Sequence, residues 1–381
     1  MKDFPYWPLA GFYFFYFSYL GAFAPYFSLY LVAIGFTAAQ IGVLMALPQV
    51  TRIFAPHLWG WLADVSDTRL AIVRWGGVAG AACYLGVFFG TGVAWLFVVI
   101  LAVSFFWSAA LPLVEATTLS HLGEQTARYG RVRVWGSLGF IAAVVVTGYV
   151  LDALPIASLL WVILGLLLGI LACSWRIPEA PGMPHGADHA PIADILRRPE
   201  VIAFIVACAL MAVAHGPYYT FYSIYLVSHG YTKGTVGWLW ALGVVSEIAI
   251  FVWMPHLYRA FTLRQILIAS FAAAALRFTV IGWMVDSALA LTLAQPLHAA
   301  TFGSFHAAAV GVIHRLFRGR HQARGQTIYG SLTFGLGGTL GGLYSGYAWD
   351  RFGAEATFSI AALCAAAGML LLIWKLRFEA R

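Results

Sequence analysis

The chain has 381 residues, of which 62% are hydrophobic and only 10% are charged. A soluble domain carries about 25% charged residues, so this composition excludes a protein with a water-facing surface all round. The formal net charge of +7 would suit a nucleic-acid partner, but the placement of the basic residues, described below, marks it as an orientation signal instead.

Apolar stretches long enough to cross a bilayer follow one another along the chain. A spanning helix needs about 20 predominantly apolar residues. We place twelve spans at about 6–33, 40–61, 71–90, 93–120, 134–151, 156–175, 200–228, 234–255, 265–285, 288–313, 327–348 and 355–374. The first is crowded with Phe and Tyr and lacks a small-residue cleavage pattern, so we interpret it as a span and not as a signal peptide. The prediction is an all-α membrane protein.

The basic residues divide unequally between the two sides of this layout. Eighteen of the 22 fall on one side, only Lys233 and Arg351 fall on the other, and Arg52 and Arg277 lie inside spans. Lys and Arg concentrate in cytoplasmic loops. We therefore expect a multi-pass protein of the inner (cytoplasmic) membrane with both termini in the cytoplasm.

The longest polar stretch, 176–199, is rich in Pro and Gly and separates the sixth span from the seventh. It predicts a cytoplasmic linker between an N-terminal bundle, 1–175, and a C-terminal bundle, 200–381. His185 and His189 within it have a spacing that could suit a metal ion, but we expect a flexible loop there. We predict neither a metal site nor a cofactor.

The two halves repeat each other. The aligned pairs are 27–37 with 222–232, 136–138 with 330–332, and 148–152 with 346–350. The register of the first pair, continued along the chain, sets Arg52 opposite Glu247. Duplicated bundles with binding groups where the repeats meet are the layout of secondary transporters. The prediction is therefore two pseudo-symmetric bundles of six helices each.

Four charged residues lie inside or at the edge of apolar spans: Glu115, Arg133, Glu247 and Arg277. A charge at the centre of a spanning helix costs about 2.5–3.5 kcal/mol on insertion scales. Such residues normally face a polar cavity or one another, and they mark the path of a substrate or a proton.

Each charge has a functional and a structural interpretation. Glu247 is the first candidate proton carrier, or it forms a permanent ion pair with Arg277 that fixes helix packing. Arg277 binds a substrate carboxylate or neutralises Glu247, since a guanidinium grips a carboxylate in two places. Arg52 is the alternative anion anchor. Glu115 belongs to the substrate-binding or proton-coupling site, or it pairs with Arg133 only to stabilise the structure. Arg133 could also anchor the membrane interface.

Three histidines are further candidates. His298 and His306 are two helical turns apart and so share a face of the tenth span. His215 begins an aromatic stretch in the seventh span. Histidine titrates near neutral pH and can relay protons, although a buried neutral histidine bonded to a neighbour is the alternative for each.

Between the second and third spans, Gly60, Asp64 and Arg69 follow a pattern of glycine, aspartate four residues on, and then a basic residue. Together with the two halves, this resembles the signature of the major facilitator superfamily. The family has a basic residue directly after the aspartate, where this chain has Val65. The resemblance implies that the three residues belong to a cytoplasmic gate.

Within the superfamily the chain is most similar to the phenylpropionate permease group, which is related to lactose permease, over nearly its whole length. The segments that carry this resemblance are 129–137, 218–225, 243–247, Arg277 and 296–298. Glu115 precedes Arg133 by eighteen residues, the separation of the sugar-binding pair in lactose permease. Phe140 stands where that permease stacks its sugar on a tryptophan, and Thr301 replaces a carboxylate central to its proton release. These departures argue against a sugar.

The resemblance implies proton-coupled symport of a small aromatic carboxylate, such as phenylpropionate, by alternating access. The alternatives are a sugar or nucleoside proton symporter, or a small-molecule exporter of the same superfamily. HExxH, GxSxG and P-loop motifs are missing from the sequence, so we expect no enzyme. The expected partners are the substrate, protons and the lipid bilayer, and we expect a monomer that binds no nucleic acid.

Overall fold

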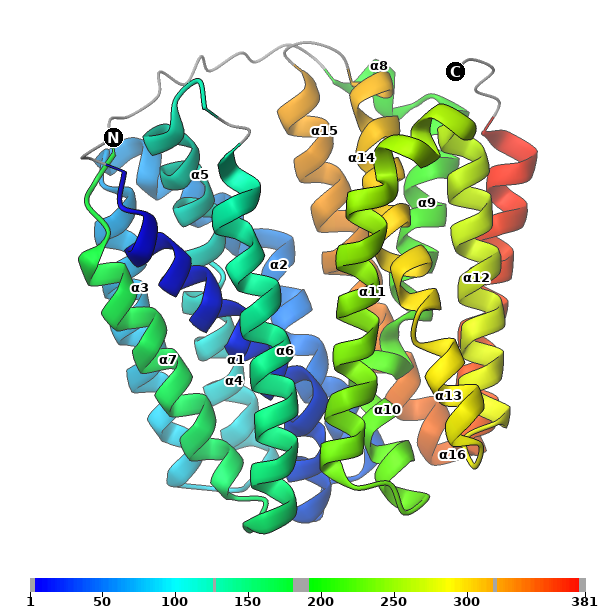
Figure 1. The fold of residues 1–381 in the computed structure, drawn as a ribbon, viewed down its shortest axis with the longest axis horizontal. Helices are drawn as coiled ribbons and strands as arrows, with labels where there is room; N and C mark the ends of the chain where they lie inside the picture. The colour runs from blue at the N-terminus through cyan, green and yellow to red at the C-terminus, as the bar shows by residue number, and fades with distance from the viewer. Residues whose placement is uncertain (1–3, 126–127, 181–191, 318–320, 377–381) are drawn as a thin grey trace. The chain divides into compact units, whose positions relative to one another are not determined.

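The computed structural model describes residues 4–125, 128–180, 192–317 and 321–376, and within them it contains helices and no strand. Before the linker the helices are α1 (Tyr6–Ala33), α2 (Ala38–Ser66), α3 (Arg69–Tyr84), η1 (Leu85–Phe88), α4 (Val93–Trp107), α5 (Ala110–Leu122), α6 (Tyr129–Ala153) and α7 (Ser158–Arg176). After it they are α8 (Ala193–Leu196), α9 (Pro199–Ala214), α10 (Gly216–Ser228), α11 (Lys233–Ala260), α12 (Leu263–Trp283), α13 (Ala288–Ala294), η3 (Ala299–Ser304), α14 (Phe305–Leu316), α15 (Gln322–Tyr329), η5 (Gly330–Gly337) and α16 (Gly338–Lys375) (Figure 1).

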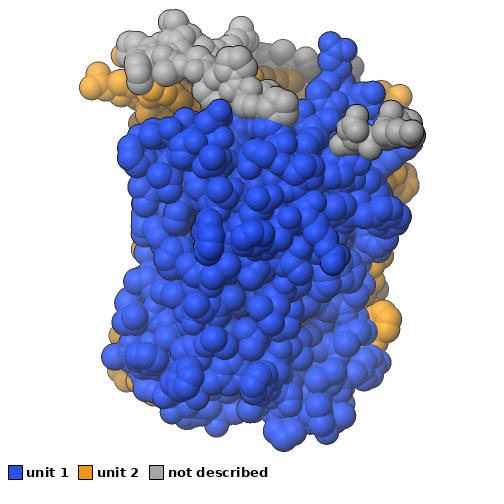
Figure 2. All heavy atoms as spheres, turned by 90° about the vertical axis from the view of Figure 1, so that its left-hand side faces the viewer, with its two compact units in different colours: residues 1–36, 50–186, 232–237 blue, residues 37–49, 187–231, 238–381 orange. Residues whose placement is uncertain are grey.

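The chain divides into two compact units, coloured separately in Figure 2. Unit 1 contains residues 1–36, 50–186 and 232–237, and unit 2 contains the remainder. Most of each unit comes from one sequence half, but each also takes the start of one helix from the other half. Part of the predicted linker, with His185 and His189, lies outside the described residues.

In unit 1, α1 packs along α6 and α7, and α3 packs on α4, α5 and α7 (Figure 1). Helix α1 is apolar all round, and it is mostly buried because its neighbours cover it. In unit 2, α16 packs on α9, α10 and α12. Large apolar side chains elsewhere face outward, such as Phe89, which is 81% exposed, and Val252, which is 76% exposed. An apolar outer surface of this kind suits lipid and not water.

Ten helical stretches within the described residues are long and apolar enough to cross a membrane. Two features account for the difference from the twelve predicted spans. The last two predicted spans form one helical stretch, Arg324–Lys375, whose junction is Gly353 at φ +85°, a conformation that favours glycine. The predicted span 288–313 is divided among α13, η3 and α14.

The repeat predicted from the sequence appears as duplicated contacts. The carboxylate of Asp152 accepts hydrogen bonds from the amides of 233–234, the start of α11, at 2.9 and 2.8 Å. The aligned Asp350 accepts them from the amides of 38–39, the start of α2, at 3.1 and 2.8 Å. A carboxylate at a helix N-terminus satisfies free amides and opposes the helix dipole. The two halves therefore share the same contact, in which an aligned aspartate caps the start of a helix.

Close helix packing in unit 1 depends on glycine at position 139. A side chain there would meet the carbonyl oxygen of Phe14 on α1 at 2.2 Å. Because the obstacle is a backbone atom, Gly139→Ala should push α1 away from α6 and lower the free energy of unfolding by about 1–3 kcal/mol. Gly165→Ala on α7 is the matched control, since nothing lies within 4 Å of position 165. Thermal unfolding in detergent measures the effect, and equal melting temperatures for the two variants would contradict it.

Candidate functional site

Arg277 is the centre of a buried polar cluster in unit 2. Its side chain, on α12, is fully buried. Its Nη1 donates to His298 Nδ1 at 3.1 Å and its Nη2 to Gln295 Oε1 at 3.2 Å. The guanidinium carbon lies 4.1 Å from the ring centre of Tyr218, a cation–π contact. Its Nε has no hydrogen-bond partner among the described residues. These hydrogen bonds go to neutral groups, so they leave the charge of the guanidinium uncancelled.

An interruption of the predicted tenth span places His298 beside Arg277. Helix α13 ends before Gln295, and Pro296 has no amide hydrogen to continue it. His298 then leads into η3, a π-helical segment of the kind often found at functional sites. Because arginine only donates hydrogen bonds, His298 Nδ1 is the acceptor in this contact. The exchangeable hydrogen of its neutral ring is therefore on Nε2.

His215 lies at a second interruption, between α9 and α10. Pro217 in the first turn of α10 is tolerated there because that amide would have no helical partner. His215 Nδ1 donates to the Met211 carbonyl at 2.8 Å, and Nε2 faces the Thr301 hydroxyl at 3.3 Å. The ring centres of His215 and His298 are 6.4 Å apart. The structure thus brings together two of the predicted histidines and Arg277.

Glu247 on α11 lies close to the same cluster because two neighbouring positions, Gly243 and Gly303, have no side chain. A side chain at Gly303, in η3, would meet Glu247 Cγ at 3.2 Å. One turn before Glu247, a side chain at Gly243 would meet the His298 ring at 3.3 Å. Glu247 is half-buried. His306 lies apart from Arg277, among the aromatic rings of Phe302, Tyr329 and Phe334.

The second acid–base pair, Glu115 and Arg133, lies in unit 1. Arg133 Nε is 3.9 Å from Glu115 Oε1, and the two side chains are 32% and 36% exposed. A shorter contact to Glu115 comes from Tyr129, whose hydroxyl donates to Oε1 at 2.9 Å. The Arg133 guanidinium lies 4.0 Å from the ring centre of Phe17 on α1. The predicted pair is brought together, within a cluster that also contains Tyr129 and Phe17.

Sequence reasoning missed the roles of Tyr129 and Gln295. Tyr129 lies one helical turn before Arg133, and that spacing could have indicated a shared face. Gln295 is an amide in an apolar stretch just before a proline, a combination that could have indicated a buried partner for the arginine. Phe17 gave no separate signal among the many aromatic residues of the first span.

The other predicted site residues also lie in unit 1. Arg52 on α2 is exposed, and it lies within electrostatic range of the Tyr16 side chain on α1. Phe140 is half-buried, and its backbone lies against α1, where a side chain at Gly21 would meet its carbonyl oxygen at 2.7 Å. Tyr16 stacks on Trp107 with ring centres 4.5 Å apart and planes within 9°.

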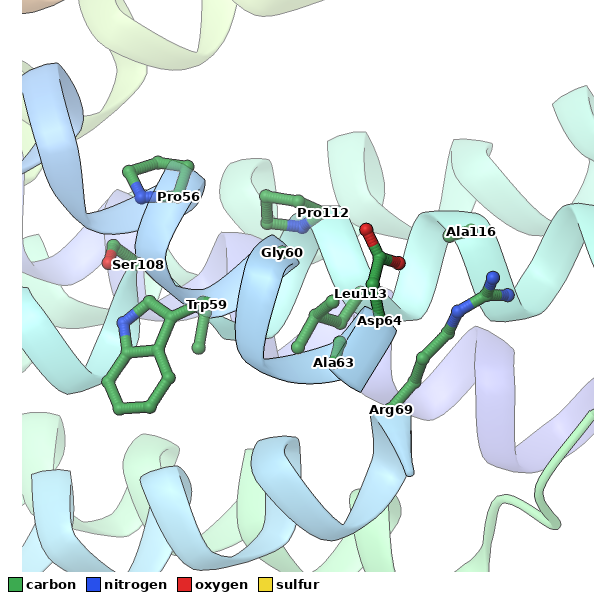
Figure 3. A pocket seen from close by; sticks show the side chains of 11 residues that line it. Pro56, Trp59, Gly60, Ala63, Asp64, Arg69, Ser108, Pro112, Leu113 and Ala116 are labelled. Atoms are coloured by element: carbon green, nitrogen blue, oxygen red, sulfur yellow. The ribbon is translucent and has the colours of Figure 1, made fainter. Parts of the chain in front are cut away.

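The predicted gate residues Gly60, Asp64 and Arg69 line one cavity of about 210 Å³ between α2, α3 and α5 (Figure 3). Asp64 projects from α2 and Arg69 from the start of α3. Arg69 Nη1 donates to the Ser120 hydroxyl at 3.2 Å. Among the described residues, no group of three or more His, Cys, Asp or Glu could hold a metal ion.

Comparison with known proteins agrees with this architecture. The sequence matches the family described as MFS_1 like over residues 6–360. It is 30% identical over 372 residues to the "Probable 3-phenylpropionic acid transporter" of Escherichia coli (strain K12), covering 96% of each chain. It is 28% identical over 374 residues to the maltose permease of Geobacillus stearothermophilus, covering 95% of this chain and 92% of the relative. The fold is similar to that of the nucleoside transporter NupG, with a TM-score of 0.85 at 18% identity, covering 98% of this chain and 100% of that one.

Proposed function

Because this chain belongs to the MFS_1-like family, and so is a multi-pass membrane transporter of the major facilitator superfamily, we propose that it carries a small aromatic carboxylate together with a proton by alternating access. The family and the relatives found here are transporters and not enzymes.

The observation that supports a carboxylate substrate is the buried Arg277. Its charge is held by neutral partners, and its Nε lacks a hydrogen-bond partner among the described residues. A guanidinium buried without a counter-charge is costly, and an arriving carboxylate would relieve that cost through charge-assisted hydrogen bonds. A buried arginine whose hydrogen-bond partners among the described residues are neutral is therefore suited to an anion.

Aromatic rings beside Arg277 support an aromatic substrate. The ring of Tyr218 lies under the guanidinium. It stacks on the ring of Tyr222, with ring centres 4.8 Å apart, and contacts the tilted ring of Trp240, with ring centres 4.5 Å apart. A ligand ring attached to the bound carboxylate would meet such faces in offset or edge geometry. The name of the relative from Escherichia coli refers to 3-phenylpropionic acid, which combines these two features. We take this compound as the first probe.

Glu247 is our proposed proton carrier, since it lies beside the cluster and can hold or release a proton as the site is hydrated. Protonated Glu247 would leave the positive charge of Arg277 available to the substrate. The substrate would then bind more tightly to the protonated protein, which is the differential affinity that coupling requires.

The proposal predicts uptake that follows the proton gradient. Proteoliposomes acidified outside should accumulate radiolabelled 3-phenylpropionate above the outside concentration, and a protonophore should remove the accumulation. The protonated acid also crosses lipid unaided, so empty liposomes of the same lipid are the control. Uptake by the protein that is equal with and without the gradient would exclude symport.

A sugar is the second candidate, because the maltose permease is a relative and because Glu115, Tyr129 and Arg133 form a polar group able to bind hydroxyls. We also propose that Gly60, Asp64 and Arg69 belong to a cytoplasmic gate, and that the protein lies in the inner membrane with both termini in the cytoplasm. Export in place of import is the alternative direction of transport. Competition separates the substrates: excess maltose should leave 3-phenylpropionate uptake unchanged, and strong inhibition would favour the sugar.

A further inference from the structure

Gln295 is fully buried and uses its whole side-chain amide. Oε1 accepts from Arg277 Nη2 at 3.2 Å and from the Tyr218 hydroxyl at 3.4 Å. Nε2 donates to the Tyr222 hydroxyl at 2.7 Å and to the Leu291 carbonyl at 3.3 Å. All four hydrogen bonds that a glutamine amide can readily form are therefore present.

The orientation of this amide follows from its neighbours. Arginine has only donors, so the oxygen of the Gln295 amide must face Arg277. The backbone amide of Gln295 bonds to the Thr292 carbonyl instead of continuing the α-helical pattern to Leu291. The side-chain Nε2 satisfies the Leu291 carbonyl in its place. The end of α13 thus fixes the amide that holds Arg277.

This contact has a consequence for charge. An amide accepts a hydrogen bond from the guanidinium without cancelling its positive charge, whereas a carboxylate of the same shape would cancel it. The other groups bonded or stacked on Arg277, His298 and Tyr218, are also uncharged in this geometry. With Glu247 protonated, the cluster carries one positive charge.

We propose that Gln295 is a positioning residue that sets the charge preference of the site, so that it accepts a substrate with a single negative charge, a monocarboxylate. This inference rests on the proposed function, in which Arg277 holds the substrate carboxylate. Gln295 has a double effect: it aims the guanidinium through one oxygen, and it leaves the positive charge for the ligand.

The test compares Gln295→Glu with Gln295→Met in the full-length protein. Glu keeps the shape and the oxygen that accepts from Arg277 but replaces the NH2 donor with a second oxygen and adds a negative charge, whereas Met keeps the approximate length and neutrality but loses all the hydrogen bonds. We expect Gln295→Glu to weaken binding of 3-phenylpropionate at least about tenfold more than Gln295→Met does. The neutral probe 3-phenylpropionamide should show no such difference between the two variants.

A purely structural role predicts the opposite order, since Glu preserves more of the native contacts than Met. Weaker binding in Gln295→Met than in Gln295→Glu would therefore overturn the inference. Gln326→Glu, the same change at an exposed site on α15, is the matched control and should bind 3-phenylpropionate like the wild type.

A readout without substrate separates this inference from the proposed function. In the Glu247→Gln background, which mimics protonated Glu247, Gln295→Glu supplies the counter-charge that the cluster lacks and should raise the melting temperature of the ligand-free protein above that of Gln295→Met. A wild type that binds no 3-phenylpropionate would reject the proposed substrate but leave this comparison decisive. A melting temperature of Gln295→Glu at or below that of Gln295→Met would show that the cluster is already neutral, and the inference would fail.

Discussion

Arg277→Gln should abolish accumulation of 3-phenylpropionate and weaken its binding at least about 100-fold, because a carboxylate would then enter a buried site without its counter-charge, at a cost of about 3–5 kcal/mol. The substituted glutamine can still donate hydrogen bonds from its NH2 group, but it carries no charge. The ligand would also lose the planar pair of donors that grips a carboxylate in two places.

Arg277→Lys is the informative companion. Lysine keeps the charge but replaces the fork with a single ammonium group. The structure gives Arg277 two separate acceptors, Gln295 and His298, and a cation–π contact with Tyr218. One ammonium group cannot reproduce these contacts and also grip a ligand. We expect weakened binding with some transport remaining, between the wild type and Arg277→Gln.

Binding is measured on purified protein by equilibrium titration, and accumulation is measured in proteoliposomes. Arg259→Gln removes a charge at an exposed position in the last turn of α11 and should leave both unchanged. Retention of near-wild-type affinity by a well-folded Arg277→Gln variant would exclude Arg277 as the carboxylate anchor. The exposed Arg52 would then become the next position to test.

The second large effect concerns Glu247. Glu247→Gln should exchange 3-phenylpropionate across the membrane while failing to accumulate it against a gradient. Glutamine resembles the protonated carboxyl group in shape and neutrality, so the substrate-binding form persists. Because it cannot release a proton, movement of the substrate is no longer linked to the proton gradient.

Two assays on the same proteoliposomes separate coupling from packing. Counterflow measures exchange without a pH gradient, and uptake under an imposed gradient measures accumulation. Loss of accumulation alone supports the carrier role. A parallel loss of both activities with a lower melting temperature would support the alternative, in which Glu247 only fixes helix packing. Glu124→Gln, at an exposed turn after α5, is the control for removing an acid.

The architecture was largely predictable because hydropathy and glycine positions act locally. An apolar stretch must form helix in lipid, where every backbone group needs a partner within the segment. The aligned Gly35 and Gly230 both adopt positive φ, at +91° and +84°, and the aligned Asp152 and Asp350 make the same contact with a helix start. The predicted major facilitator fold is confirmed by the family match and the structural likeness.

The interruptions within spans were not predicted. His215 separates α9 from α10, and Gln295 follows the end of α13. Hydropathy averages over a window and does not detect a break of one or two residues. Pro217 and Pro296 were visible in the sequence, but proline is tolerated inside spanning helices when neighbours satisfy the freed backbone groups. Only the packed neighbours decide whether a proline bends a helix or ends it.

The sequence alone determined that charged side chains lie within apolar spans, because the cost of a charge in lipid depends on residue type and depth and is readable from order along the chain. Tertiary structure decided which of those side chains meet: Arg277 contacts His298 and Gln295, and Glu115 has its shortest contact with Tyr129. A hydrogen bond depends on distances of about 3 Å between atoms of different helices. Helix rotation and local breaks set those distances, and neither is encoded in the composition of any one span.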